Sequence, residues 1–144
     1  AEPGNALVAT AFDYVVEVTD TREPKTGDVF VSTDGKRNDI DPRFRSNQWK
    51  RKVVCGLSNL TLSERPIIAR QTLCGCTCME HDRILEFENH SKLLPGDRVV
   101  IHHAGAYTLA LAPMFISQLP VVYSLDDHSI SLCREQWKPE AWLR

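Results

Sequence analysis

Short runs of β-branched and other apolar residues divide this chain, and polar turn residues separate them. The clearest run is Arg98 to His103, which contains three consecutive aliphatic residues between a Pro-Gly-Asp turn and a glycine. Such a run predicts a strand that is buried on both faces. Further strands are expected at residues 12–18, 29–31, 52–55, 66–78, 83–88, 121–124 and 129–133. Short strands at this spacing favour a mainly β domain, folded as a barrel or a sandwich.

Polar segments interrupt the strand pattern. Residues 22–28 form a polar turn between the first two predicted strands, so these strands are expected to pair as a hairpin. Residues 33–51 are predicted to form a loop with a short helical turn, and to be the most flexible part of the chain. Residues 136–144 contain two tryptophans and are expected to end the domain with a helical turn.

Composition restricts the class of protein. The 144 residues, 42% of them apolar, are enough for one domain with its own core. A net charge of −2 gives no electrostatic reason to expect nucleic acid or an anionic membrane as a partner. The sequence contains no apolar run near the ~18 residues of a membrane span, and its first residues do not resemble a secretory signal. Five cysteines make a poor disulfide framework, so a reducing, cytoplasmic setting is expected.

Three of the cysteines, Cys74, Cys76 and Cys78, alternate with other residues and allow three interpretations. On a strand this period of two places the sulfurs on one face. They would lie ~7 Å apart, too far for one tetrahedral zinc ion without distortion, so a metal site that also uses His81 is the minor alternative. Burial as small apolar residues suits Cys55, Cys74 and Cys133. Cys78 ends the predicted strand among titratable residues, where a reactive thiol is as plausible as a buried one.

Other polar residues give weaker signals. Glu80 and Asp82 are interpreted as a solvated edge unless further evidence makes them a catalytic pair. His102 and His103 should face opposite sides of a strand, so that one is buried and a shared metal is not expected. Tyr107 follows two small residues, which would either let an anion approach its hydroxyl or allow its ring to pack at a barrel rim.

Three motifs, in order along the chain, resemble one enzyme family. The segment 75–85, GCTCMEHDRIL, is similar to the signature Gly-Pro-x-Cys-(Asp/Glu)-x-x-Asp of the pyridoxal-phosphate-dependent decarboxylases of the ornithine/diaminopimelate type, in the alanine racemase-like fold group. Residues 94–115 resemble the family block that contains Gly-Asp, Gly-Ala-Tyr-Thr and Phe. The opening Glu2-Pro3-Gly4 resembles the Glu-Pro-Gly-Arg motif near the end of the family's α/β barrel. The resemblance implies that the chain corresponds to the family's C-terminal β domain.

The resemblance also implies roles for individual residues. Cys78 takes the position of the cysteine that reaches into the partner subunit's active site and is implicated in protonating the substrate carbon after carbon dioxide leaves. Tyr107 matches the tyrosine of the cofactor phosphate site. Glu2 matches the partner of the pyridine nitrogen, and Gly4 the glycine whose backbone contacts the phosphate. Asp82 takes the last acidic position of the signature and is expected to shape the interface or the substrate pocket. The implied cofactor is pyridoxal 5′-phosphate (PLP), and the implied assembly is a homodimer.

Several residues depart from the family pattern. Asn5 stands where the family has arginine, and Cys76 replaces a proline. Met79 stands where an acidic residue meets the distal ammonium of the substrate, and a thioether cannot pair with an ammonium. Glu80 is one position away, but on a strand that shift points it to the opposite face. These departures favour a modified amino acid of the siderophore or antibiotic type over an ordinary basic amino acid.

The resemblance predicts that residues 1–10 are the end of the barrel and that residues 11–144 are the β domain. The family's Schiff-base lysine lies in the barrel, and the lysines of this chain lie outside a matching motif, so the isolated chain is expected to be inactive. A barrel in the same or a separate chain is the expected partner. The alternatives are a decarboxylase-like domain that has lost catalysis and regulates or binds a partner, and a metal-binding β domain.

Overall fold

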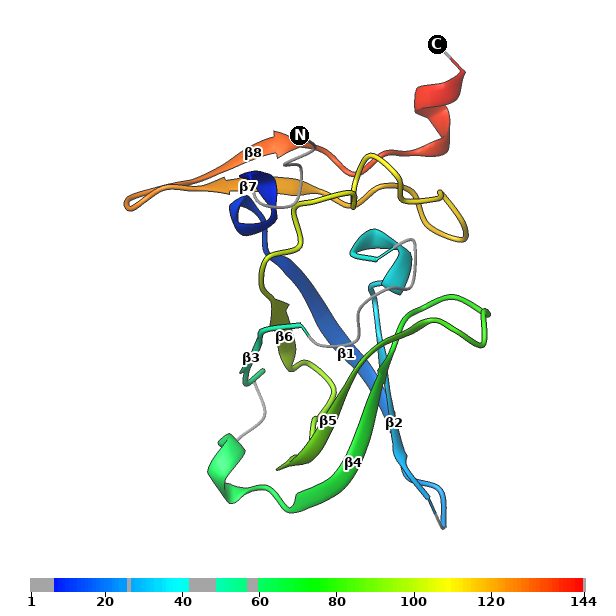
Figure 1. Cartoon of the computed structure of the whole chain (residues 1–144), viewed down its shortest axis with the longest axis vertical. Helices are drawn as coiled ribbons and strands as arrows, with labels where there is room; N and C mark the ends of the chain where they lie inside the picture. Colours follow the sequence, from blue (N-terminus) through cyan, green and yellow to red (C-terminus); the bar gives the residue numbers. More distant parts are fainter. Residues whose placement is uncertain (1–6, 26, 42–48, 57–59, 144) are drawn as a thin grey trace.

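The computed structural model describes residues 7–25, 27–41, 49–56 and 60–143. Its strands are β1 (Tyr14–Arg22), β2 (Val29–Thr33), β3 (Arg51–Val54), β4 (Ile67–Cys74), β5 (Arg83–Ser91), β6 (Arg98–Ile101), β7 (Val122–Leu125) and β8 (Ile130–Arg134). Its 3₁₀ turns are η1 (Ala9–Ala11), η2 (Arg37–Asp39), η3 (Leu62–Glu64) and η4 (Pro139–Trp142). The prediction of a mainly β domain is confirmed (Figure 1).

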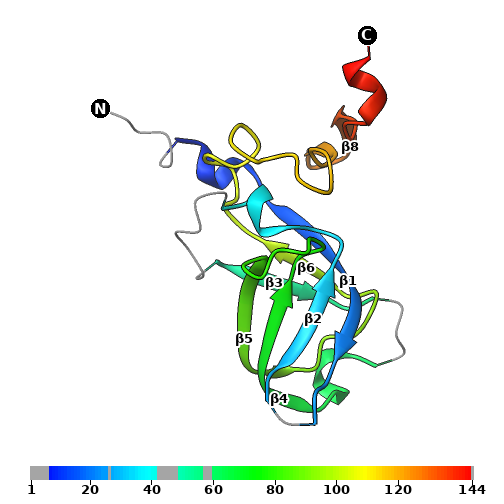
Figure 2. The same ribbon diagram turned by 90° about the vertical axis from the view of Figure 1, so that its right-hand side faces the viewer.

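Six strands form one curled sheet in the order β3-β6-β1-β2-β4-β5. Neighbours are antiparallel except for β2 and β4, which run parallel. The strands β3 and β5 are the two edges of this sheet, yet the guanidinium of Arg51 on β3 donates to the carbonyl oxygen of Glu86 on β5 at 2.9 Å. The same guanidinium lies 4.8 Å from the centre of the Phe87 ring. The curl therefore brings the two edges close enough for a side chain to bridge them (Figure 2).

The concave side of the curled sheet contains the hydrophobic core. On β2 the alternating residues Val29, Val31 and Thr33 are buried, as the period-two pattern of a half-buried strand requires. The other strands contribute residues such as Val16, Leu73, Ile84, Val99 and Ile101 to the same cluster. The hairpin β7–β8 is a separate two-stranded sheet, and its apolar residues Leu125, Ile130 and Leu132 are exposed.

Most of the predicted elements are confirmed, with shifted ends. The hairpin between the first two strands is present as β1 and β2, and the closing helical turn is present as η4. The predicted strand 66–78 is wrong beyond residue 74, because the chain leaves the ladder there and turns toward β5. The predicted strand 98–103 is wrong beyond Ile101, and His103 adopts a positive φ of 63°.

The predicted loop after β2 is present, and its short helical turn is confirmed as η2, but residues 35–41 are packed against the sheet, which does not fit the prediction of the most flexible part of the chain. Nearly all of these residues are buried, Lys36 and Asp39 among them. The segment contains η2 and packs against β1, where the Tyr14 hydroxyl donates to Asp39 Oδ2 at 2.8 Å. Within the part of the chain that the structure describes, no helix is long and apolar enough to cross a membrane.

Candidate functional site

The loop between β4 and β5, residues 75–82, carries the cysteine motif. A backbone hydrogen bond from Gly75 N to Asp82 O at 2.8 Å closes the loop at its base, and one from Asp82 N to Met79 O at 3.0 Å closes a turn within it. Cys78 lies exposed at the surface of this loop, whereas Asp82 is only 3% exposed. The loop therefore exposes the thiol of Cys78 at the surface and buries the carboxylate of Asp82.

The buried carboxylate of Asp82 organises this loop. Its Oδ1 accepts a hydrogen bond from Arg37 N at 2.7 Å, and its Oδ2 accepts from Thr77 N at 3.0 Å and from the Thr77 hydroxyl at 2.5 Å. Gly75 is required at this place, since a Cβ there would lie 2.2 Å from the Asp82 carboxylate. The interpretation of Asp82 as part of a solvated edge is thus wrong, because the side chain supplies acceptors for otherwise unpaired amides.

We expect Asp82→Ala to lower the free energy of unfolding by about 2–3 kcal/mol, because it removes a charged acceptor and leaves buried donors unpaired. Urea unfolding followed by far-UV circular dichroism measures this loss. Glu80→Ala on the same loop is the matched control, since Glu80 is exposed, and it should change stability by less than about 0.5 kcal/mol. Equal stability of the two variants would contradict the anchoring role of Asp82.

The prediction that Cys74, Cys76 and Cys78 lie on one face of a strand is wrong. Cys74 is the last residue of β4, and residues 76 and 78 belong to the loop. Burial raises the pKa of the Cys74 thiol, which favours its protonated form. Cys55 and Cys133 are exposed, so their prediction as buried apolar residues is wrong. Among the described residues, no three histidine, cysteine or carboxylate side chains lie together in a way that could hold a metal ion.

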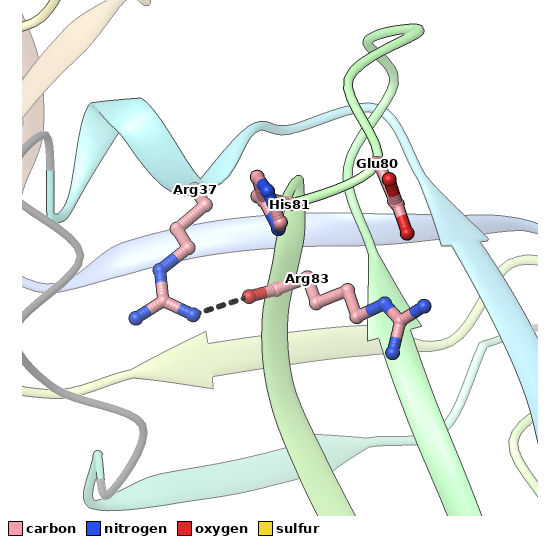
Figure 3. A pocket seen from close by; sticks show the side chains of 4 residues that line it. All are labelled: Arg37, Glu80, His81 and Arg83. Atoms are coloured by element: carbon pink, nitrogen blue, oxygen red, sulfur yellow. Dashed lines mark hydrogen bonds between the residues drawn. The ribbon is translucent and has the colours of Figure 1, made fainter.

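An open pocket of about 480 Å³ lies beside this loop and is lined by Arg37, Glu80, His81 and Arg83 (Figure 3). Arg37 is fixed there, because its Nη1 donates to Arg83 O at 2.9 Å and its Nη2 pairs with Asp41 Oδ2 at 3.2 Å. On a strand, Glu80 would point to the face opposite Met79. Residues 79–82 form a turn instead, so this prediction does not apply. The pocket thus combines cationic side chains with one carboxylate.

The second motif segment, with Tyr107, follows β6 and packs on the N-terminal part of the chain. Ala104 N donates to Phe12 O at 2.8 Å, and Gly105 N donates to Ala9 O at 3.1 Å. A Cβ at Gly105 would lie 1.9 Å from Val8 O, so only glycine permits this approach. Tyr107 adopts a positive φ of 59°, and its side chain is 41% exposed. Glu2, Gly4 and Asn5 lie outside the described residues.

The β4–β5 loop, η2 and the segment that contains Tyr107 lie at the same end of the curled sheet (Figure 2). The described structure therefore brings two of the three motifs to one end of the domain, although they come from different strand connections. His102 and His103 also follow β6, and His102 Nδ1 lies 2.9 Å from Asp13 Oδ2. Neither histidine is fully buried, so the expectation of one buried histidine is wrong.

Comparison with known proteins shows what this chain resembles. Protein-family models give no match. Diaminopimelate decarboxylase from Helicobacter pylori is 26% identical over 136 residues, which cover 94% of this chain and 32% of that protein. L-Glutamyl-[BtrI acyl-carrier protein] decarboxylase from Niallia circulans is 29% identical over 122 residues, which cover 78% of this chain and 27% of that protein. A crystal structure of diaminopimelate decarboxylase matches 97% of this chain and 35% of its own, with a TM-score of 0.78 and 21% identity. Over nearly its whole length the chain is therefore similar, in sequence and in fold, to the C-terminal β domain of the ornithine/diaminopimelate-type decarboxylases. It spans about a third of the length of these relatives.

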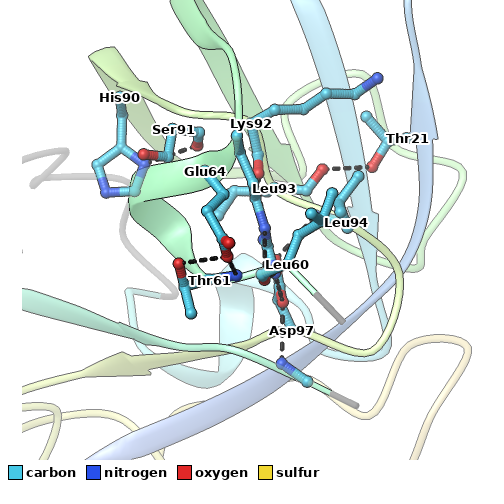
Figure 4. A network of polar contacts seen from close by, with 12 residues as sticks. Thr21, Leu60, Thr61, Glu64, His90, Ser91, Lys92, Leu93, Leu94 and Asp97 are labelled. Carbon is cyan, nitrogen blue, oxygen red and sulfur yellow. Dashed lines mark hydrogen bonds and ion pairs between the residues drawn. The ribbon is translucent and has the colours of Figure 1, made fainter. Parts of the chain in front are cut away.

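The Pro-Gly-Asp motif of this decarboxylase-type domain has a structural role. Asp97 is fully buried and forms a bidentate ion pair with Arg65, which is also buried. The carboxylate further accepts from Leu94 N at 2.8 Å and from Gly56 N at 2.9 Å (Figure 4). The ion pair fixes the connection from β3 to β4 against the turn before β6. Sequence reasoning predicted only the turn, because nothing near Asp97 indicates its partner at residue 65.

Sequence reasoning also missed Lys36 in the decarboxylase-type domain. Its side chain is fully buried, and its ammonium donates to the carbonyl oxygens of Pro113, Phe115 and Ser117. A lysine in a polar loop is ordinarily solvated, so no local pattern indicated this contact.

Proposed function

We propose that this decarboxylase-type domain is part of a PLP-dependent amino-acid carboxy-lyase, in which it contributes residues to an active site at a dimer interface. The observation that carries the proposal is Cys78, which is exposed on a loop that the buried Asp82 holds in a defined conformation. A proton donor must be accessible to the substrate and must also be held in a fixed position.

In this proposal the domain's own residues hold the cofactor and deliver a proton. Tyr107, whose side chain is partly exposed after two small residues, would direct its hydroxyl to a phosphate oxygen. Glu2 would pair with the pyridine nitrogen, and the Gly4 backbone with the phosphate. PLP supplies an electron sink for the bond that breaks.

Decarboxylation requires a proton donor, and this is the role proposed for Cys78. When the bond from the α-carbon to the carboxylate breaks, carbon dioxide leaves and the electron pair stays with the α-carbon. Cys78 Sγ–H then gives its proton to that carbon, and the thiolate recovers a proton from water. The carbon must be shielded from bulk water until then, which fits a site covered by two subunits.

The proposed substrate class is a modified amino acid of the siderophore or antibiotic type, with a basic amino acid as the other possibility. Met79 cannot pair with a distal ammonium, but Glu80 faces a pocket that also contains Arg37 and Arg83. Such a pocket suits a distal group with both polar and anionic character. The relative from Niallia circulans acts, by its name, on a glutamyl group attached to an acyl-carrier protein, which supports a substrate other than a free basic amino acid.

The proposed partners are an α/β barrel that carries the Schiff-base lysine, in the same or a separate chain, and a second copy of the complete enzyme. Residues 1–10 would be the end of that barrel and residues 11–144 the β domain. Exposed apolar residues on the hairpin β7–β8 support a covering partner, because isolated domains rarely expose such groups together. The five unpaired cysteines support a cytoplasmic location.

Release of carbon dioxide by the complete protein tests the proposal. The purified protein is supplied with PLP and incubated separately with diaminopimelate, ornithine, lysine, arginine, glutamate and a carrier-bound glutamyl thioester. We expect carbon dioxide release from at least one of them, and none when PLP is omitted. Failure with all substrates, together with no retention of PLP on gel filtration, would favour the alternative, a catalytically inactive decarboxylase-like domain that binds or regulates a partner.

A further inference from the structure

The buried Lys36 makes an unusual set of contacts. Its side chain has no solvent exposure, and its Nζ lies 2.8 Å from Ser117 O, 3.2 Å from Pro113 O and 3.4 Å from Phe115 O. Asp39 Oδ1 lies 3.7 Å from the same nitrogen and partly balances its charge. An ammonium has three protons to donate, and all three carbonyl acceptors come from one short segment.

That segment, residues 113–117, adopts a conformation that its sequence does not favour. Phe115 N donates to Pro113 O at 2.9 Å and Ser117 N donates to Phe115 O at 2.8 Å, so two tight turns follow one another. Ile116 has a φ of 67°, which is a steric outlier for a β-branched residue. Such a conformation persists only where surrounding contacts impose it. The three hydrogen bonds from the Lys36 ammonium to the carbonyl oxygens of Pro113, Phe115 and Ser117 are contacts of this kind.

The residues on either side of Lys36 hold the cysteine loop. Gly35 O accepts from Cys76 N at 2.8 Å, and Arg37 N donates to Asp82 Oδ1 at 2.7 Å. Gly35 itself lies tightly against β1, since a Cβ there would lie 2.3 Å from a side-chain carbon of Val16. Three consecutive residues therefore connect the loop that carries Cys78 with the segment that follows Tyr107.

We infer that residues 35–37 act as a clamp that sets the position of the Tyr107 segment relative to the Cys78 loop, with Lys36 as the positioning residue. The structural part of this inference concerns the order of residues 107–117 and is independent of catalysis. Its functional part rests on the proposed function, because a displaced Tyr107 segment would weaken the hold on the cofactor phosphate.

Hydrogen–deuterium exchange on the complete protein tests the clamp, with Lys36→Met as the variant. Methionine keeps most of the side-chain volume but removes the donors. We expect the amides of Phe115 and Ser117, which are hydrogen-bonded in this segment, to exchange about tenfold faster or more, since the charge-assisted hydrogen bonds that hold the segment are lost, while the β4–β5 ladder exchanges as before. Lys52→Met on β3 is the matched control, because Lys52 is exposed, and it should leave both regions unchanged.

PLP affinity is the second readout, measured by titrating the cofactor-free protein. We expect Lys36→Met to bind PLP roughly tenfold more weakly than Lys52→Met, the loss that one charge-assisted contact explains. If the unmodified protein itself binds no PLP, the proposed function fails, but the exchange result still decides the clamp.

Two results would overturn the clamp. One is unchanged exchange of the Phe115 and Ser117 amides in a folded Lys36→Met protein. The other is exchange of these amides at the rate of an unstructured peptide in the unmodified protein. The second measurement needs no variant, so it decides the matter even if Lys36→Met does not fold.

Discussion

Replacing Cys78 with alanine is expected to slow carbon dioxide release by the complete enzyme by about 10²- to 10⁴-fold, or to divert the proton to another carbon, with little loss of stability. The range is what a positioned general acid ordinarily contributes. The fold should survive because Cys78 is exposed on the β4–β5 loop, and the anchoring hydrogen bonds of that loop belong to Asp82.

Rate and product together decide the role of Cys78. Steady-state release of carbon dioxide gives the rate, and mass spectrometry of the product after reaction in deuterated water shows where the proton went. Cys133→Ala is the matched control, because Cys133 is also exposed but lies on β8. A Cys78→Ala enzyme with unchanged rate and product would remove Cys78 from the mechanism.

Replacing Asp97 with asparagine is expected to lower the free energy of unfolding by about 3–5 kcal/mol, since it leaves the Arg65 charge buried without its partner. Such a loss is a large fraction of the stability of an ordinary domain. Urea unfolding at neutral pH measures it. Glu17→Gln breaks the exposed pair of Glu17 with Arg98 and is the matched control, expected to cost less than about 1 kcal/mol.

The same ion pair predicts a dependence on pH. Burial opposes ionisation of Asp97, but Arg65 and the amides of Gly56 and Leu94 outweigh it and hold the pKa of the carboxyl below its ordinary value. A lowered pKa means that the contribution to stability is fully present above the ordinary carboxyl pKa, near ~4, and is lost as the pH falls through the lower folded value. Asp97→Asn should therefore flatten the acid limb of a plot of stability against pH. An unchanged acid limb would show that other groups dominate acid unfolding.

The strand pattern shows how far local sequence reasoning extends. The hairpin of β1 and β2 follows from apolar runs on either side of a polar turn, and those signals lie within about 20 residues of each other. The motif positions of Cys78 and Tyr107 are equally local. The strand pattern predicted the end of β4 wrongly. The alternation of cysteines continues past Cys74, but the backbone turns there and donates hydrogen bonds to the Asp82 carboxylate.

The sequence by itself determined the β character of the domain and its main hairpin, since period-two alternation and turn residues act between near neighbours. Its motifs also indicated which enzyme family the chain resembles. Only the tertiary structure decided which charged residues are buried. Asp97 meets Arg65 across 32 residues, Asp82 meets the backbone of Arg37 across 45, and Lys36 meets Ser117 across 81. A buried charge is stable only beside its partner, and the fold brings these partners together.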